Sequence, residues 1–217
     1  LHIYGPKGIK EIILLQIKLS KSYTKYNLFF HELESDQSEL IFEDDKIAVY
    51  TIPLKHRVYT NGFLFKEKPG LRRINIDAAT EKNIDICYFN KLKQGSDLKQ
   101  EDGTVIENET VTFDPLPTQS YAFCSDTVYN EEIIPLIENV DVLYHESTFL
   151  EQDIEKCIPT GHSTAIQAAT IAKKANVKNL ILGHYSTRYS DINLFKKEAD
   201  TVFEPTFLAD DGLVFKF

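Results

Sequence analysis

The sequence contains no methionine and no tryptophan, and only three of its 217 residues are cysteine. It has no apolar run near the roughly 20 residues that a membrane-spanning helix needs, and its first residues do not resemble a signal peptide. Three cysteines without zinc-ribbon spacing argue against a disulfide framework and are typical of a reducing compartment. We therefore predict a cytoplasmic protein without a membrane segment.

The absence of methionine extends to the first position, which is Leu1. Because natural proteins begin with Met, we expect that an N-terminal part is missing and that any site found here is incomplete. Acidic residues outnumber basic ones by 33 to 24, and the resulting net charge of −9 argues against a non-specific nucleic-acid binder. The 42% of hydrophobic residues suffices for a sizeable core and excludes global disorder.

The first part of the chain is rich in strand-like runs. Helical spacing of isoleucine and leucine predicts a helix over residues 6–21, with Pro6 in its first turn. A polar stretch at 66–103, interrupted by proline and glycine, predicts an inserted arm. Runs rich in Ile, Val, Tyr and Phe predict strands at 27–31, 39–42, 46–54 and 58–65.

After residue 117 the pattern changes to alternating strands and helices, which makes the fold class α/β. Ser163 is the predicted N-cap of a helix whose inner face is rich in alanine. Further helices are predicted at 130–137 and 193–203, and strands at 120–125, 141–144, 179–182, 206–208 and 213–217.

Side chains that bind metals or move protons follow four of the predicted strands. In α/β proteins, ligands and catalytic groups gather at the carboxyl ends of strands. Each residue also has a structural alternative, such as a hydrogen-bonded loop histidine or a turn-capping aspartate. The common location favours a shared site over separate structural roles. The candidates are His56, Asp126, His145 with Glu146, and His184, together with His162 at the start of a helix.

Imidazole and carboxylate groups are a ligand set that zinc prefers, and two bridged zinc ions can activate water and clamp a phosphoryl group. His56, Asp126 and His184 therefore suggest phosphodiester hydrolysis. Three ligands are too few for two metal ions, so further ligands are expected in the missing N-terminal part.

These residues lie in segments that resemble the later two-thirds of bacterial ribonuclease Z, the tRNA 3′-processing endonuclease family of the metallo-β-lactamase fold. The segments occur in the family order and at family-like spacing. They are LHIYGPKGIK at 1–10, His56 with Gly62, FCSDT at 123–127, HESTF at 145–149, GHSTA at 161–165, LGHYSTRY at 182–189 and ADDG at 209–212.

The resemblance implies an αββα sandwich without its N-terminal part, formed as a single domain over residues 1–217 with the basic arm inserted at about 66–103. It implies that His56 binds one zinc, His184 the other, and Asp126 bridges them. Glu146 with His162 would form the relay that protonates the leaving 3′-oxygen. An upstream H-x-H-x-D-H motif would complete the set of two zinc ions, or of other divalent metals, so the chain alone is expected to be inactive.

The arm is expected to contact RNA. Residues 55–95 contain nine basic and four acidic side chains, a basic excess that suits local binding of phosphates. The alternative is an ordinary solvated loop. The stretch CYFNKLKQG at 87–95 keeps the Lys-Leu-Lys-x-Gly end of the family's arm signature but lacks its Gly-Pro, which leaves the mode of binding tRNA open. The predicted RNA-binding residues are Lys66, Lys68, Arg72, Arg73, Lys91 and Lys93.

The resemblance, together with these residues, implies a zinc-dependent endoribonuclease that removes 3′ trailers from precursor tRNA, leaving a tRNA 3′-hydroxyl and a 5′-phosphorylated trailer. The resemblance implies a homodimer. Two alternatives remain open at this point: a small-molecule phosphodiesterase or arylsulfatase-like hydrolase of the same fold, and a non-catalytic RNA-binding remnant.

Overall fold

The computed structural model describes residues 1–100 and 103–217, so residues 101–102 of the predicted arm lie outside the described residues. The chain forms two compact units. The first contains Leu1–Phe42, Val49–Phe65 and Ser120–Phe217, and the second contains Glu43–Ala48 and Lys66–Gln119. The predicted arm corresponds to the second unit, which continues past Gly103 to Gln119.

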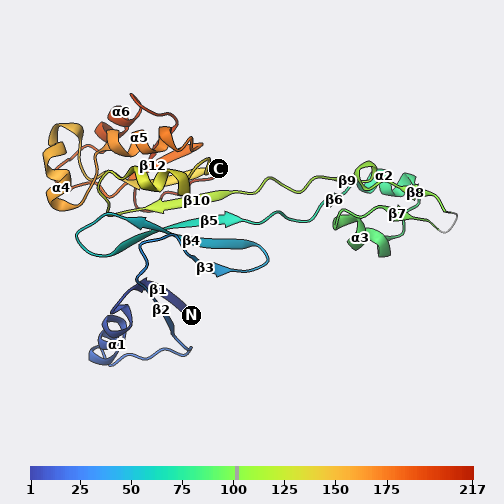
Figure 1. Cartoon of the computed structure of the whole chain (residues 1–217), viewed down its shortest axis with the longest axis horizontal. Coiled ribbons are helices and arrows are strands. Elements are labelled where there is room, and N and C mark those ends of the chain that lie inside the picture. Colours follow the sequence, from blue (N-terminus) through green and yellow to red (C-terminus); the bar gives the residue numbers. More distant parts are fainter. Residues whose placement is uncertain (101–102) are drawn as a thin grey trace. The chain divides into compact units, whose positions relative to one another are not determined.

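A seven-stranded sheet organises the first unit (Figure 1). Strands β10 to β13 are parallel neighbours, as expected where strands alternate with helices. In spatial order the strands are β13 (Thr206–Leu208), β12 (Asn179–Gly183), β11 (Val142–Glu146), β10 (Ser120–Cys124), β5 (Thr60–Glu67), β4 (Ile47–Leu54) and β3 (Leu40–Glu43).

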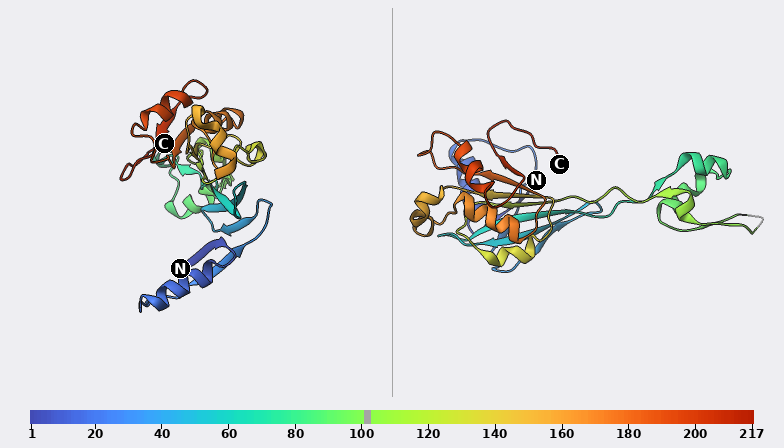
Figure 2. Two further views of the ribbon diagram at one scale, coloured as in Figure 1. Left: turned by 90° about the vertical axis from the view of Figure 1, so that its left-hand side faces the viewer. Right: turned by 90° about the horizontal axis from the view of Figure 1, so that it is seen from above.

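Helices cover one face of this sheet, as the views in Figure 2 also show. They are α4 (Cys157–Thr160), α5 (Ala165–Lys174) and α6 (Asn193–Ala199), with the 3₁₀ helices η3 (Glu131–Leu136) and η4 (Glu151–Lys156). Alternate residues of the strands, such as Leu143 and Leu180, pack against the alanines of α5 and against Phe195 of α6. Small alanine side chains let α5 approach the sheet closely, so this layer forms the main core.

The N-terminal segment differs from the predicted helix over 6–21. Strand β1 (His2–Pro6) pairs in parallel with β2 (Phe29–Leu33), so Pro6 ends a strand and does not begin a helix. Helix α1 (Ile9–Leu19) starts only after Gly8, whose φ of 90° is left-handed and separates strand from helix.

Three other expectations in the later half are wrong. Thr164, not Ser163, caps α5, because its hydroxyl and the Gln167 side chain form a reciprocal capping box while the Ser163 hydroxyl donates to the Thr127 carbonyl. Helix α6 ends at Ala199, short of residue 203. Residues 213–217 form no strand; the rings of Phe215 and Phe217 instead pack against Phe207.

The second unit has its own small core and is not an irregular loop. Leu92, Leu98, Ile106 and Val111 are buried together, and the Asn108 amide donates to two backbone carbonyls beside them. Its elements are β6 (Arg73–Ile74), α2 (Ile76–Glu81), η1 (Ile86–Tyr88), α3 (Phe89–Lys93), β7 (Leu98–Lys99), β8 (Val105–Ile106), η2 (Asn108–Thr110) and β9 (Thr112–Phe113).

No helix within 1–100 and 103–217 has the length and apolar character needed to cross a membrane.

The Asp141 carboxylate connects the starts of β10 and β11, and its contribution to stability can be tested. Asp141 accepts hydrogen bonds from the backbone and hydroxyl of Ser120 and pairs with Lys178 at 2.6 Å. Partial burial acts to raise the pKa of Asp141, but the hydrogen bonds from Lys178 and Ser120 outweigh it and hold that pKa below its ordinary value. The folded state therefore favours the ionised carboxylate.

Asp141→Asn is expected to lower the free energy of unfolding by about 1 kcal/mol at neutral pH. Because the folded pKa is lowered, this contribution is present above the unfolded pKa and disappears as the pH falls through the folded pKa. Urea unfolding of wild type and variant should thus converge in acid. A difference in stability that persists unchanged at low pH would contradict the ionic role of Asp141.

Candidate metal and catalytic site

The parallel strands bring the predicted residues to one edge of the sheet. Cys124 of β10 pairs with His145 of β11, which pairs with Leu182 of β12, so these strands end side by side. Asp126 and His184 lie two residues beyond Cys124 and Leu182, respectively, and Glu146 is the last residue of β11. Their convergence results from strand register.

Asp126, His162 and His184 form the central cluster, with one potential ligand atom of each within 4.8 Å of the others. The Oδ1 atom of Asp126 lies 3.3 Å from Nε2 of His184 and 3.9 Å from Nδ1 of His162. Asp126 and His184 both have left-handed backbones, with φ of 59° and 61°. Such conformations are uncommon for residues other than glycine, although Asp, Asn and His tolerate them best.

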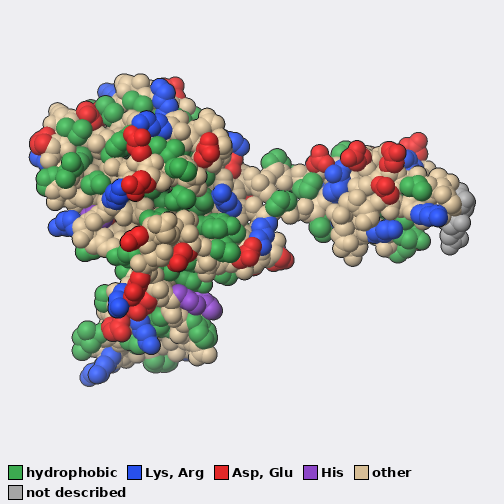
Figure 3. Space-filling model, in the orientation of Figure 1, with side chains coloured by type: hydrophobic (Ala, Val, Ile, Leu, Met, Phe, Trp, Pro, Cys, Tyr) green, Lys and Arg blue, Asp and Glu red, His purple; other side chains and the backbone are tan. Residues whose placement is uncertain are grey.

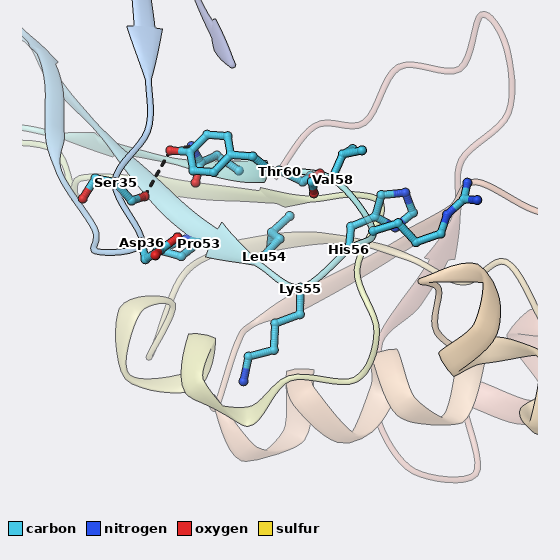
Figure 4. A pocket seen from close by; sticks show the side chains of 11 residues that line it. Ser35, Asp36, Pro53, Leu54, Lys55, His56, Val58 and Thr60 are labelled. Atoms are coloured by element: carbon cyan, nitrogen blue, oxygen red, sulfur yellow. Dashed lines mark hydrogen bonds between the residues drawn. The ribbon is translucent and has the colours of Figure 1, made fainter. Parts of the chain in front are cut away.

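His56 lies beside this cluster without being part of it. Its ring centroid is 5.2 Å from that of His162, and its Nδ1 lies 2.8 Å from the Gly161 carbonyl oxygen. A carbonyl only accepts, so Nδ1–H donates to it and a neutral ring keeps its lone pair on Nε2. Figure 4 shows His56 in the lining of a pocket formed by residues 53–61 with Ser35 and Asp36, where Tyr59 donates to the Ser35 carbonyl.

Glu146 is a fully buried carboxylate surrounded by donors. Its Oε1 accepts from the Thr127 amide and from Nδ1 of His162, and its Oε2 accepts from the Thr148 amide, the Thr148 hydroxyl and the Ser163 amide. Burial acts to raise the pKa of Glu146, but the hydrogen bonds from His162, Thr148 and Thr127 lower it on balance. With five donors, Glu146 is a fixed anion.

His162 is held by that anion at a distance of 2.8 Å. The hydrogen bond to Glu146 is the main reason that the pKa of His162 is raised, against the opposing effect of burial. Since Nδ1 is committed to Glu146, the other ring nitrogen is the atom that His162 can offer to a substrate. Phe149 contacts the ring edge-on, with centroids 6.4 Å apart.

His145, the remaining strand-end candidate, is not part of the site. It is fully buried, and burial lowers the pKa of its ring. Its Nδ1 lies 2.7 Å from the Glu146 carbonyl oxygen, and its Nε2 has no hydrogen-bond partner among the described residues. A ring that packs in the interior cannot reach a ligand at the edge of the sheet.

The donor set fits a divalent metal of the zinc type. Asp126 supplies a carboxylate, and His184 and His56 supply imidazoles whose Nδ1 atoms already have partners, at Thr148 Oγ1 and the Gly161 carbonyl. Zinc-binding histidines typically use one ring nitrogen for the metal and the other for such a hydrogen bond. These donor types suit a metal ion, but the group of potential ligand atoms that lie close together is Asp126, His162 and His184, with His56 outside it.

Several of the predicted RNA-binding residues of the second unit have internal partners. Arg72 pairs with Asp114 at 2.6 Å and bonds to Thr112, Arg73 donates to the Asp114 carbonyl, and Lys68 pairs with Glu43. Two arginines therefore hold the chain segments of this unit together. Among the described residues, no hydrogen bond or ion pair engages the side chains of Lys66, Lys91 and Lys93.

The second unit is also less basic than expected. Its main segment, Lys66–Gln119, carries eight basic and ten acidic side chains, because five acids after residue 100 add to those of the earlier part. Figure 3 shows Asp and Glu gathered along one edge of this unit, apart from most Lys and Arg. The expectation of an arm with a basic excess is wrong for the unit as a whole.

Sequence reasoning missed the residues that support the site. Glu146 accepts hydrogen bonds from Thr148, Thr127 and Ser163. The Gly161 carbonyl accepts a hydrogen bond from the His56 ring. They lie within the segments FCSDT, HESTF and GHSTA, so their proximity to candidate residues was the available signal. Their roles depend on contacts between residues far apart in the chain.

Fold and site together define the class of protein. The architecture is similar to that of the metallo-β-lactamase fold protein YhfI from Bacillus subtilis, with a TM-score of 0.59 at 19% identity over all of this chain and 65% of that one. It is also similar to the short form of human tRNase Z, with a TM-score of 0.62 at 23% identity over 99% of this chain and 67% of that one. The predicted metallo-β-lactamase fold is confirmed.

Sequence comparison then identifies the family. The chain is 42% identical over 217 residues to ribonuclease Z of Cytophaga hutchinsonii, covering 99% of the chain and 69% of that relative. It is 39% identical over 213 residues to ribonuclease Z of Porphyromonas gingivalis, covering 98% of the chain and 70% of that relative. No protein-family model matches the chain. The chain belongs to the ribonuclease Z family.

Gly161 offers a test of how His56 is oriented. A Cβ atom at this position would lie 2.3 Å from His56 Nδ1, and the φ of 85° is left-handed. Gly161→Ala is expected to displace the ring and weaken zinc binding about 10- to 100-fold. Gly212→Ala is the matched control, because Gly212 has a φ of 82° and no atom within 4 Å of the added methyl.

Both variants carry the backbone penalty of about 1–2 kcal/mol in unfolding, measurable by thermal denaturation. Only Gly161→Ala should lose zinc affinity in a calorimetric titration. Equal zinc affinity in the two variants would contradict the role of Gly161 in orienting the His56 ring.

Proposed function

We propose that the chain carries catalytic groups of a zinc-dependent endoribonuclease that removes the 3′ trailer from precursor tRNA. The observation that carries the proposal is the pair formed by His162 and the buried Glu146, set beside Asp126 and His184. The identity of the relatives supports the same proposal, since the chain is 42% identical over its length to a ribonuclease Z. The products would be a tRNA ending in a 3′-hydroxyl and a trailer beginning with a 5′-phosphate.

Three residues would hold metal. Asp126 would bridge two ions, with His184 on one and His56 on the other through its Nε2 atom. Bound zinc would supply Lewis-acid polarisation of the phosphoryl oxygens and lower the pKa of water. These three residues are fewer than the donors that two zinc ions require, so two ions per subunit imply further ligands.

His162 would deliver the proton that the leaving 3′-oxygen needs when its bond to phosphorus breaks. Glu146 remains ionised throughout, because five hydrogen bonds stabilise its anion. Its part is to hold the His162 ring in place and favour the protonated imidazole, as the raised pKa of His162 indicates. In this proposal only His162 carries the proton, whereas the sequence-based expectation assigned the relay to Glu146 and His162 together.

The test of the reaction is the chemistry of the cleaved ends. A precursor tRNA incubated with the full-length protein, which would carry the further metal ligands, and with zinc should yield a trailer that phosphatase treatment alters and a tRNA that RNA ligase can extend at its 3′-hydroxyl. A 3′-phosphate on the tRNA fragment would show that the other phosphodiester bond breaks, and would overturn the proposed product assignment.

Lys91 and Lys93 test whether the second unit binds RNA. Both lie in α3, and Lys93 lines a shallow pocket together with Phe89 and Arg73. Lys91→Ala with Lys93→Ala is expected to weaken precursor tRNA binding about tenfold and to reduce its salt dependence, since two phosphate contacts are lost. Hydrolysis of a small phosphodiester such as bis(p-nitrophenyl) phosphate should not change.

Lys10→Ala, on α1 in the first unit, is the matched control and should leave both activities unaltered. The near balance of charge in the second unit favours one competing function, a small-molecule phosphodiesterase of the same fold. Unchanged tRNA affinity in the double variant, with efficient hydrolysis of the small ester, would support that competitor.

Two finer features complete the proposal and rest on family membership. We propose that the active protein is a cytoplasmic homodimer, in which the second unit of one subunit holds RNA that is cut by the other. Light scattering of the intact protein, and complementation between an Asp126→Ala subunit and a subunit carrying the Lys91 and Lys93 changes, test this arrangement. Complementation is expected only if the two regions act across subunits.

A further inference from the structure

The Thr148 side chain lies between two groups of the proposed site. Its Oγ1 atom is 2.7 Å from Oε2 of Glu146 and 2.9 Å from Nδ1 of His184. The residue is 7% exposed, so water has little access to the hydroxyl. The Thr148 hydroxyl therefore connects the Glu146 carboxylate, which holds His162, with His184, a proposed metal ligand.

The number of available protons fixes the direction of both hydrogen bonds. The ionised Glu146 carboxylate can only accept, so the single hydroxyl proton of Thr148 points to Glu146. The hydroxyl can then only accept from His184, which requires a proton on Nδ1 of that ring. A neutral His184 must consequently carry its lone pair on Nε2.

This lone pair faces another acceptor. Nε2 of His184 lies 3.3 Å from Oδ1 of Asp126. Two acceptors at this separation repel each other unless a proton or a cation lies between them. The arrangement suits a divalent cation that takes one ligand from each residue.

We propose that Thr148 is a positioning residue that holds His184 in the Nδ1–H tautomer and so presents Nε2 to a divalent cation shared with Asp126. The proposal rests on the proposed function for the role of that cation. It also links the two halves of the site: Glu146 orients His162 directly through one oxygen and His184 through the Thr148 hydroxyl on the other. Substituting Thr148 therefore affects metal binding without removing a ligand.

Metal-free protein gives a test that does not depend on nuclease activity. Long-range proton–nitrogen NMR, at a pH where the imidazoles are neutral, distinguishes the two tautomers of His184. Wild type and Thr148→Ser should show the Nδ1–H form, whereas Thr148→Val, which keeps the shape and loses the hydroxyl, should show a mixture. An Nε2–H ring in wild type would overturn the proposal without any variant having to fold.

Titration with zinc alone measures the consequence. Thr148→Val is expected to bind zinc about 10- to 100-fold more weakly than wild type, the usual effect of losing a hydrogen bond to a ligand, and Thr148→Ser should lie within about threefold of wild type. Thr170→Val is the matched control, because the Thr170 hydroxyl donates to the Ile166 carbonyl within α5. It should match wild type.

The outcomes separate this proposal from the proposed function. Zinc affinity in Thr148→Val equal to wild type, or a serine variant as weak as the valine variant, would overturn the positioning role even if precursor tRNA is cleaved. The expected tautomers in a protein that does not cleave precursor tRNA would support the role of Thr148 while contradicting the proposed reaction.

Discussion

Asp126→Ala in the full-length protein is expected to abolish tight zinc binding and to reduce precursor tRNA cleavage by about a thousandfold or more. Asp126 is the carboxylate of the cluster with His162 and His184, and the proposed bridge between two metal ions. Metal stabilisation of a phosphoryl transition state amounts to several kcal/mol, and each 1.4 kcal/mol changes the rate about tenfold. Zinc content by elemental analysis and single-turnover cleavage measure the two effects.

The left-handed backbone of Asp126 requires a careful choice of variants. Alanine is unfavourable at a φ of 59°, whereas asparagine tolerates this conformation, so Asp126→Asn separates loss of the charge from backbone strain. The exposed Asp211→Asn, in the C-terminal segment, controls for the loss of one negative charge. Full zinc content with normal turnover in Asp126→Asn would refute the bridging role.

His162→Ala in the full-length protein is expected to retain zinc and yet cleave precursor tRNA about 10²- to 10⁴-fold more slowly, the usual effect of losing a general acid. The hydrogen bond from Nδ1 to Glu146 occupies one ring nitrogen, and the raised pKa of His162 suits a proton donor. Substrates with a better leaving group than the 3′-oxygen need less protonation, so the variant should be less impaired on them.

This prediction distinguishes two roles of His162, because the residue lies close enough to Asp126 and His184 to be a metal ligand itself. A large loss of zinc in His162→Ala would mean that His162 is a metal ligand and not a proton donor. His2→Ala is the control for removal of an imidazole, since His2 stacks on Phe29 in the N-terminal strands. It should preserve both zinc content and cleavage.

Local patterns predicted most of the sheet. The apolar runs around β4, β10, β11 and β12 were recognised within a few residues of their observed ends. For β10, β11 and β12 they succeed because a buried parallel strand must be apolar along its length. Segments whose state depends on distant partners were less predictable. The first residues pair as β1 with β2, and the C-terminal phenylalanines pack on Phe207 without forming a strand.

The insertion shows the same division. Its polar composition and its proline and glycine residues mark a separate segment, but they indicate neither that the unit ends at Gln119 nor that its charges nearly balance. Burial of Leu92 with Val111 extends the compact unit into a region whose acidic residues cancel the basic excess. The contact of Arg72 with Asp114 spans residues far apart in the chain, so no local window contained it.

Residue types and order by themselves determined the α/β class, the candidate residues Asp126, Glu146, His162 and His184, and the resemblance to ribonuclease Z. Asp126, Glu146 and His184 lie at the ends of strands and His162 lies just before a helix whatever the packing, which is why a single sequence is sufficient to find them. Only the tertiary structure decided how protons are arranged among them. Five donors converge on Glu146, and the Thr148 hydroxyl joins it to His184, because strand register and the loop before α5 bring separate segments within hydrogen-bond distance.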